Sequence, residues 1–352
     1  MNDLMKLLED LSSCPGPPGG EEPVARIIRQ HLEPNCKTRR DGLGSLIATR
    51  EGTEKQPRIM LTAHMDEVGF MLQNITDGGY LRLQPLGGWI VDNLPGQRLH
   101  IHGGKGAVEG IVAAVPPHFK KEQKSELKVE DLFVDVGAAS RGEVASLGLQ
   151  LGDLITPASH FAIYNEKLLA NKAWDDRVGC AVLVAAMKRL TQQPNTVVAA
   201  ATVQEEVGSR GAVTAVELVK PQAAIVLEGA PADDLPGVAR DHPQGALGKG
   251  CQIRLYDPST IVHRQFWKWV TELAKERHIA HQLAVRQSGA TDARAIHMAQ
   301  GGIPTVVLAV PVRYAHSHSG LIHIEDFQAT MALTLAILER LDSKTLKSQL
   351  PT

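Results

Sequence analysis

The alternation of apolar segments along the 352-residue chain constrains the fold more than any other feature. Amphipathic segments of helical period alternate with short apolar runs of strand length near both ends of the chain. Alternation at this spacing predicts a mainly parallel sheet covered by helices on both faces, which is an α/β fold. Helices are predicted over 2–12, 22–31, 176–190, 262–277 and 326–341, and strands over 44–49, 58–62, 196–203, 223–229, 281–287 and 305–310. The polar tail after Leu341 is expected to fray.

Residues 70–164 differ from the rest of the chain, because short β-type segments there are separated by Gly and Pro. This pattern predicts a small all-β unit. The charged segment 118–130 is expected to be a loop within it. A β unit between two α/β stretches indicates an inserted domain, so 1–69 and 165–352 are predicted to form one discontinuous domain.

Composition excludes several classes of protein. A net charge of −2 and 4% aromatic residues are unlike a protein that binds nucleic acid. The N-terminus lacks the features of a signal peptide, and no apolar run reaches the roughly 20 residues of a membrane span. The four cysteines are far apart and form no CxxC pair, which fits a reducing compartment. We therefore expect a cytoplasmic protein that binds neither nucleic acid nor membranes.

Two adjacent carboxylates, Glu205 and Glu206, follow the predicted strand 196–203. Neighbouring side chains on a strand point to opposite faces. One carboxylate could then bind a metal while the other faces a water or a substrate, as metal-assisted hydrolysis requires. An isolated pair of this kind would more simply indicate a solvated acidic turn.

Polar residues of matching type gather where other apolar strands end, which is where open α/β sheets place their sites. Each has an ordinary explanation by itself, such as a hydrogen-bonded histidine or a helix N-cap. Together they form a set of nitrogen and oxygen ligands suited to Zn²⁺, Co²⁺ or Mn²⁺. On extended backbone, Asp66 could orient the His64 imidazole, and one carboxylate could bridge two metals. These residues are His64, Asp66, Asp175, Asp176, Glu228 and His316.

Three short motifs, AHMDE at 63–67, DDRVG at 175–179 and QEEVG at 204–208, give the chain a specific resemblance. The chain resembles the M42 family of metallo-aminopeptidases, the glutamyl- and tetrahedral-aminopeptidase group, some of which carry a cellulase label. Further segments, among them PGPPGGEE near the N-terminus and RYAHSHS near the C-terminus, stand in the family's order. The resemblance covers nearly the whole chain.

The resemblance implies a three-layer α/β/α sandwich of the zinc-exopeptidase type with an inserted PDZ-like or barrel-like domain. That domain would serve self-association, from dimer to dodecamer, and access control. The implied activity is removal of N-terminal residues from peptides by two divalent metal ions, Zn²⁺ first and Co²⁺ or Mn²⁺ as alternatives, with a metal-bridging water as nucleophile. Glu205 would be the general base and Asp66 the orienting acid. The implied metal ligands are His64, Asp175, Glu206, Glu228 and His316, with Asp175 as the bridge.

Three departures from the family's pattern keep alternatives open. Glu228 stands where members usually have Asp, Ser319-Gly320-Leu321 stands where an acidic residue commonly follows, and Ala290 replaces a Gly. Glu228 in particular keeps open a dinuclear amidohydrolase or deacylase acting on small non-peptide amides. A scaffold without activity would require a lost ligand or base, and a glycosidase would leave both histidines without a role. His318 is a reserve ligand, and Arg210, Asp292 and Arg313 could line the cleft.

Overall fold

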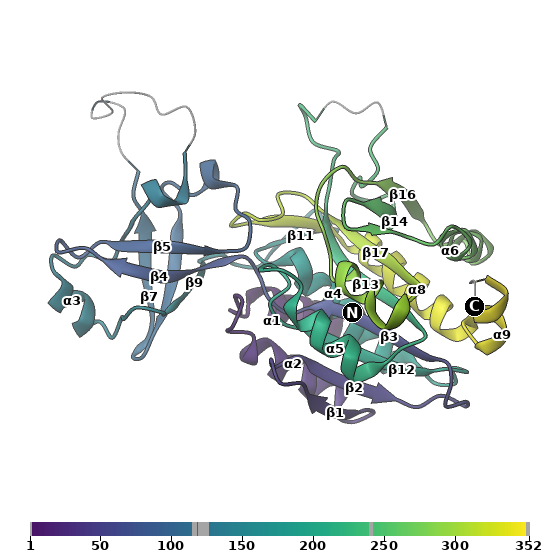
Figure 1. The fold of residues 1–352 in the computed structure, drawn as a ribbon. Coiled ribbons are helices and arrows are strands. Elements are labelled where there is room, and N and C mark those ends of the chain that lie inside the picture. Colours follow the sequence, from purple (N-terminus) through teal and green to yellow (C-terminus); the bar gives the residue numbers. More distant parts are fainter. Residues whose placement is uncertain (1, 115–117, 119–126, 239–241, 350–352) are drawn as a thin grey trace.

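The computed structural model describes residues 2–114, 118, 127–238 and 242–349. A large α/β unit carries both ends of the chain, and a smaller barrel is joined to one side of it (Figure 1). The α/β unit is built on a nine-stranded sheet in the order β1-β2-β12-β3-β13-β17-β14-β15, with β16 paired to β14. Its strands are β1 (Lys37–Arg40), β2 (Leu46–Arg50), β3 (Arg58–His64), β12 (Thr196–Thr202), β13 (Ala223–Pro231), β14 (Cys251–Asp257), β15 (Thr260–Ile261), β16 (His281–Val285) and β17 (Thr305–Val312).

The four central strands of this sheet, β12, β3, β13 and β17, run parallel to one another. They are buried along almost their whole length, as strands covered on both faces must be. Alternate side chains of β3 enter different layers, since Ile59 and Leu61 join one hydrophobic cluster and Met60 joins another. The predicted parallel sheet, apolar on both faces, is confirmed.

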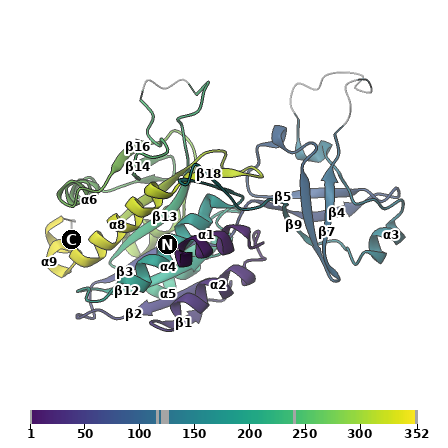
Figure 2. The same cartoon turned by 180° about the vertical axis from the view of Figure 1, so that it is seen from behind.

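Helices cover both faces of the sheet and complete the predicted three-layer sandwich. Helices α1, α2, α4 and α8 lie over one face (Figure 2), and α5 lies over the other (Figure 1). Helix α4 is buried on nearly every side because it packs between the sheet and the outer helices. The helices of this unit are α1 (Asn2–Ser13), α2 (Glu22–Leu32), α4 (Trp174–Arg189), α5 (Arg210–Val219), α6 (Arg264–Glu276), α7 (Ala293–Ile296), α8 (Ile324–Arg340) and α9 (Ser343–Gln349).

The sequence-based expectation omits several elements, among them α5 and β14, and two further differences have a clear cause. Strand β1, whose sequence is KTRR, is too polar to be recognised from apolar periodicity and forms the edge of the sheet by pairing with β2. The tail after Leu341 does not simply fray, because 343–349 form α9 and Leu346 packs against the main core. In both cases a tertiary contact decides the local structure, which a local pattern does not report.

The barrel is closed, with strand order β4-β5-β8-β7-β6-β9. Its inward-facing side chains, such as Phe70, Leu99 and Ile155, form a hydrophobic core separate from that of the α/β unit. Most of the charged loop predicted at 118–130 lies outside the described residues. The barrel's elements are β4 (Gly69–Ile75), β5 (Leu81–Leu86), β6 (Arg98–Gly103), β7 (Gly106–Val112), β8 (Val134–Asp135), β9 (Leu154–Pro157), α3 (Arg141–Ser146) and the short 3-10 helices Val91–Asn93 and Val129–Asp131.

A separate three-stranded sheet lies where the chain returns from the barrel. It contains β10 (Ala162–Tyr164), β11 (Leu168–Asn171) and β18 (Gly320–His323). The domain boundaries at 69/70 and 164/165 stay a prediction. Within the described part of the chain, no helix is both long enough and apolar enough to cross a membrane.

One buried arginine ties the N-terminal segment to the loop that follows β3. The Arg177 guanidinium on α4 is fully buried and donates to the carbonyl oxygens of Leu11 at 2.6 Å, Cys14 at 2.7 Å and Met65 at 2.7 Å. It also lies 3.4 Å from Oε1 of Glu67. Buried carbonyls need a donor, so this single side chain satisfies several acceptors at once.

We expect Arg177→Met to destabilise the protein by about 3 kcal/mol or more, because it leaves several buried acceptors unpaired. Arg189→Met, at an exposed position of the same helix, is the matched control and should change the thermal unfolding midpoint little. The measurement is thermal unfolding of both variants beside the unaltered protein. Equal midpoints for the two variants would contradict the role of Arg177.

Candidate metal centre

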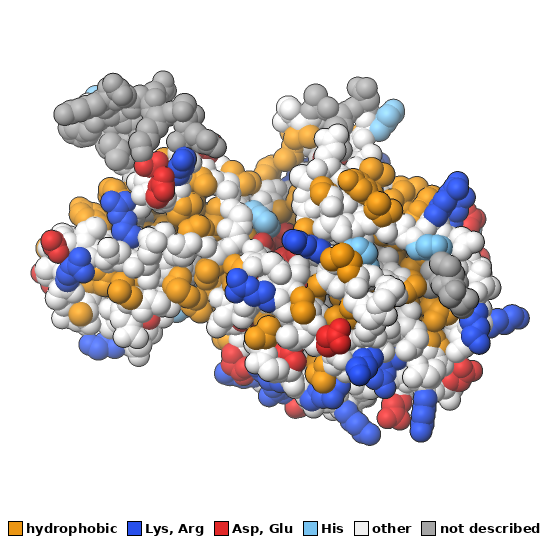
Figure 3. Space-filling view, viewed as in Figure 1, with side chains coloured by type: hydrophobic (Ala, Val, Ile, Leu, Met, Phe, Trp, Pro, Cys, Tyr) orange, Lys and Arg blue, Asp and Glu red, His pale blue; other side chains and the backbone are white. Residues whose placement is uncertain are grey.

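The candidate site lies at the carboxyl edge of the parallel strands. His64 is the last residue of β3 and pairs in register with Thr202, the last residue of β12. On the other side of β3, Val226 of β13 pairs with Thr62, which brings Glu228 level with His64. Register between neighbouring parallel strands therefore brings residues from distant parts of the sequence to one edge, where ligand sites of α/β sheets lie. The space-filling view shows histidine and acidic side chains at the junction with the barrel (Figure 3).

Asp175 lies between two histidines. Its Oδ1 is 3.1 Å from Nε2 of His64, and its Oδ2 is 3.3 Å from Nε2 of His316. Asp175 sits at the start of α4, where the backbone is not yet helical. Gly229 of β13 permits this arrangement, because a Cβ there would lie only 2.4 Å from the carbonyl oxygen of Trp174. The two carboxylate oxygens of Asp175 thus face two different imidazoles.

Two further glutamates join this pair of histidines, one on each side. Oε1 of Glu206 lies 3.3 Å from Nε2 of His316, and Oε2 of Glu228 lies 3.9 Å from Nε2 of His64. Glu228 lies within β13, which continues to Pro231, rather than beyond the end of the strand. The structure therefore brings together all five residues that the sequence predicted as metal ligands.

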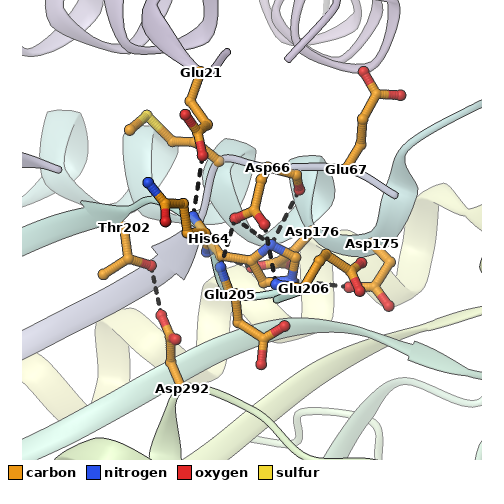
Figure 4. A network of polar contacts seen from close by, with 12 residues as sticks. Glu21, His64, Asp66, Glu67, Asp175, Asp176, Thr202, Glu205, Glu206 and Asp292 are labelled. Atoms are coloured by element: carbon orange, nitrogen blue, oxygen red, sulfur yellow. Dashed lines mark hydrogen bonds and ion pairs between the residues drawn. The ribbon is translucent and has the colours of Figure 1, made fainter. Parts of the chain in front are cut away.

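Asp66 organises the turn that carries Glu205 and Glu206. Its carboxylate is fully buried and accepts the backbone N–H of Glu205 and of Glu206, each at 3.0 Å. The same side chain lies 3.4 Å from Nδ1 of His64, and its backbone carbonyl lies 3.1 Å from that nitrogen (Figure 4). Asp66 thus contacts both the histidine and the turn, while the neighbouring Glu67 points away from the cluster.

The expectation that Glu205 and Glu206 end a strand and face opposite sides is wrong. Strand β12 ends at Thr202, and both glutamates lie in a tight turn before α5. The carbonyl of Glu205 accepts the backbone N–H of Gly208 and of Ser209, each at 2.8 Å, which closes the turn. Hydrogen bonds within the turn and to Asp66, rather than strand alternation, orient the two side chains.

The carboxylate of Asp176 accepts hydrogen bonds from the backbone. Its Oδ2 accepts the N–H of His64 at 3.0 Å, and its Oδ1 accepts the N–H of Gly179 at 3.0 Å. The bond to Gly179 is that of a helix N-cap, which the sequence allowed for this position. Gly179 has to lack a side chain, because a Cβ there would lie 2.2 Å from Oδ1 of Asp176. Asp176 thereby links the start of α4 to the end of β3.

The two histidines are strongly basic in this surrounding. Burial alone would lower the pKa of His316, but its contacts with the carboxylates of Asp175 and Glu206 raise it to about 11. Burial would likewise lower the pKa of His64, and contacts with Asp175 and Asp66 raise it well above its usual value. For Asp175, burial favours the neutral form, but His316 and His64 hold its pKa well below the ordinary range.

The remaining carboxylates are shifted the other way. Burial raises the pKa of Glu205, Glu206 and Glu228, and neighbouring negative charges add to the shift. Several buried carboxylates at one place cannot all be ionised unless positive charge is present. The cluster therefore has an excess of negative charge that a bound cation would balance.

The donor set fits a divalent cation. One ligand atom each from His64, Asp175 and Glu206 can be chosen so that all lie within 4.8 Å of one another, and the same holds for His64, Asp176 and Glu228. Oε1 of Glu228 is buried without a hydrogen-bond partner among the described residues. A buried carboxylate oxygen with no donor is costly unless a ligand uses it. Imidazole and carboxylate together suit Zn²⁺, Co²⁺ and Mn²⁺.

A cavity of about 470 Å³ opens over the cluster. Beyond the predicted ligands, its wall contains Arg254, Arg286 and Gly88, none of which was singled out from the sequence. Arg286 follows the end of β16 directly, so the strand-end pattern that identified the ligands could have found it. Gly88 comes from the barrel side of the molecule, and no pattern in the sequence relates it to the ligands.

Four other predicted residues lie outside this cavity wall. Arg313 pairs with Asp234, Arg210 is exposed, and Asp292 accepts a hydrogen bond from Thr202 at 2.5 Å. Burial raises the pKa of Asp292 to about 6. The reserve ligand His318 is buried but faces the ring of Trp89, with centroids 5.8 Å apart. These four side chains, of Arg210, Asp292, Arg313 and His318, are not gathered with the five candidate ligands.

Comparison with known proteins agrees with this geometry. Residues 44–333 match the family model described as M42 glutamyl aminopeptidase. The glutamyl aminopeptidase of Lactococcus lactis is 32% identical over 97% of this chain and 98% of its own. The TET aminopeptidase of Thaumarchaeota archaeon SCGC AB-539-E09 is 38% identical, with a TM-score of 0.96 over 99% of both chains. The TET1 peptidase of Pyrococcus horikoshii, which can assemble into a tetrahedron or a large octahedral shell, is 31% identical, with a TM-score of 0.86 over 96% of this chain and 100% of its own.

The extent of these matches settles the relationship. The family model spans most of the chain, and the relatives align over nearly the full length of both partners. Their alignment includes the barrel as well as the sheet, so the inserted barrel is part of the shared fold. The chain belongs to the M42 family of glutamyl aminopeptidases and is an aminopeptidase, a hydrolase that carries candidate metal-binding His, Asp and Glu groups.

Proposed function

We propose that the protein is a dinuclear metal-dependent aminopeptidase that removes N-terminal residues from peptides. The observation that carries the proposal is the placement of Asp175, whose two carboxylate oxygens face His64 and His316 separately. A carboxylate so placed is suited to bridge two cations. In this assignment His64 and Glu228 belong to one metal and His316 and Glu206 to the other, with Zn²⁺ preferred and Co²⁺ or Mn²⁺ as alternatives.

Bound divalent cations would make a water between them more acidic and polarise the scissile carbonyl. Glu205 is the proposed general base. It lines the cavity, and burial raises its pKa, the direction that favours proton transfer near neutral pH. Ser209 donates to Oε1 of Glu205 at 3.2 Å and restricts its orientation. Glu205 takes a proton from the attacking water and returns it to the leaving amine.

Asp66 is proposed as the orienting acid. It contacts Nδ1 of His64 and so fixes which ring nitrogen is free for a metal, namely Nε2. It also holds Glu205 and Glu206 through their backbone N–H groups. One side chain therefore sets the relative position of a proposed ligand and the proposed base.

We further propose that the barrel is a separate domain, residues 70–164, which serves self-association and limits access to the site. Its core is distinct from that of the α/β unit, and its segment around Gly88 reaches the cavity wall. Assembly of the TET1 peptidase of Pyrococcus horikoshii into a tetrahedron or a large octahedral shell supports self-association. Peptides are the proposed substrates.

Glu228 favours a second candidate function, a dinuclear deacylase acting on small non-peptide amides. The two functions are separated by assaying metal-loaded enzyme on aminoacyl-nitroanilides and on N-acyl amino acids. We expect turnover of the aminoacyl-nitroanilides, which carry a free α-amine. Turnover confined to the N-acyl amino acids would replace the aminopeptidase proposal by the deacylase.

Glu205→Gln should keep the metal and lose about 10²–10⁴-fold in turnover, because the amide cannot accept the proton. Glu206→Gln is the matched control at the adjacent residue and should lose metal as well as activity. Metal content by atomic emission and steady-state rates on an aminoacyl-nitroanilide check both variants. Near-normal turnover in Glu205→Gln would remove it from the role of base.

Metal binding should release protons. The raised pKa of His316, about 11, means that its ring is protonated at neutral pH in the metal-free protein, whereas a ligand ring must give up that proton. Affinity should therefore rise with pH, by about tenfold per pH unit for each proton released. Titration of metal-free protein with Zn²⁺ between pH 6 and 8 measures the slope. A flat profile would contradict the release of a proton by His316 on metal binding.

A further inference from the structure

The segment 87–90, which connects barrel strand β5 to the 3-10 helix Val91–Asn93, contacts two of the proposed ligands. We propose that this segment is a positioning element through which the barrel holds Glu206 and His316 in place, so that metal affinity depends on it. The inference rests on the ligand roles proposed above and adds residues from outside the ligand set. Its support comes from contacts at both ends of the segment.

Gly87 packs directly against Glu206. Its backbone has φ +91, and a Cβ there would lie 3.1 Å from Cβ and 3.2 Å from Oε2 of Glu206. The same Cβ would lie 2.8 Å from Cγ1 of Val68, in the loop after β3. Glu206 is thus confined between its own turn and the Gly87 backbone, and a Cβ at position 87 would require Val68 and Glu206 to shift.

The following residues hold the loop of His316. The backbone N–H of Ile90 donates to the carbonyl oxygen of His316 at 3.3 Å. Gly88 faces the ring, since a Cβ there would lie 3.7 Å from Nδ1 of His316. His316 itself has φ +60, a left-handed conformation that a histidine adopts only where its surroundings favour it. The contacts with Gly88 and Ile90 are such surroundings.

Trp89 anchors the segment to the barrel. Its ring stacks on Phe70, a residue of the barrel core, with centroids 4.7 Å apart, and its Nε1 donates to the carbonyl of Gly69 at 3.0 Å. The ring of His318, two residues beyond His316, also lies near Trp89, with centroids 5.8 Å apart. The segment therefore joins the barrel core to both Glu206 and the loop of His316.

The test compares two glycines of the same backbone type. Gly87→Ala introduces the Cβ that meets Glu206, whereas Gly96→Ala at φ +82 introduces one with nothing within 4 Å. Both substitutions place a side chain at a left-handed backbone position, so the difference between them reports the contacts of the added Cβ with Val68 and Glu206. The probe is Co²⁺, added to full-length protein from which metal has been stripped, and the readouts are its dissociation constant and its visible absorption spectrum.

We expect Gly87→Ala to weaken Co²⁺ binding by about tenfold or more and to change the Co²⁺ spectrum, as displaced groups beside ligands do. Gly96→Ala should stay within about twofold of the unaltered protein. Thermal unfolding of both metal-free variants checks that each is folded. Equal affinities for the two alanine variants would overturn the inference while leaving the proposed metal centre intact.

Substitution of Trp89 provides a second, independent test of the inference. Trp89→Phe keeps a ring on Phe70 and loses only the bond to Gly69, so it should retain most of the Co²⁺ affinity, whereas Trp89→Ala should lose about tenfold or more. Unchanged affinity in Trp89→Ala would contradict anchoring through this ring. If the unaltered protein itself bound no Co²⁺, the failure would belong to the proposed function rather than to this inference.

Discussion

Buried negative charge at the carboxyl edge of the central sheet is the constraint on which the rest of the site depends. Asp175, Glu206 and Glu228 converge on two histidines, and their side chains are only 14%, 6% and 6% exposed. Carboxylates in such a setting either take up protons or require cations. The pKa values of both histidines are raised for the same reason, because a protonated imidazole carries a positive charge that offsets the neighbouring carboxylates. A divalent cation that replaces those protons would therefore stabilise the folded protein.

Backbone hydrogen bonds to two further aspartates keep this cluster ordered. Asp66 accepts two N–H groups of the turn after β12, and Asp176 accepts those of His64 and Gly179. Each of these carboxylates therefore satisfies donors that would otherwise be buried and unpaired. Because the bonds run from one element to the next, β3, β12 and α4 are fixed relative to one another at the point where ligands leave them. The remaining carboxylates are then free to serve a metal.

The sequence predicts those features of the fold and the site that depend on local patterns better than those that depend on contacts between distant residues. The parallel sheet follows from β-branched and apolar runs such as 196–203, whose burial needs no distant information. His64 and His316 follow from strand ends, because parallel strands bring those ends to one edge, whereas Asp175 stands just before a predicted helix. The side chains of Glu205 and Glu206 could not be oriented from alternation, because long-range bonds to Asp66 form their turn. Helix α9 was misjudged for the same reason, since Leu346 packs against the distant main core, whereas strand β1 was missed because its sequence KTRR is polar.

The contacts of the segment 87–90 with Glu206 and His316 join residues that are far apart in the sequence and belong to different units. Glycines at 87 and 88 look from the sequence like an ordinary turn between two barrel strands, and turns of that kind tolerate change when they face solvent. Here a Cβ at position 87 would meet Val68 and Glu206, and Gly88 lies against the ring of His316. A barrel with no role at the site would not have to pack against the proposed ligands of the α/β unit. The close packing of this segment, with Trp89 fixed in the barrel core, means that the barrel and the metal centre have to be considered as one structure.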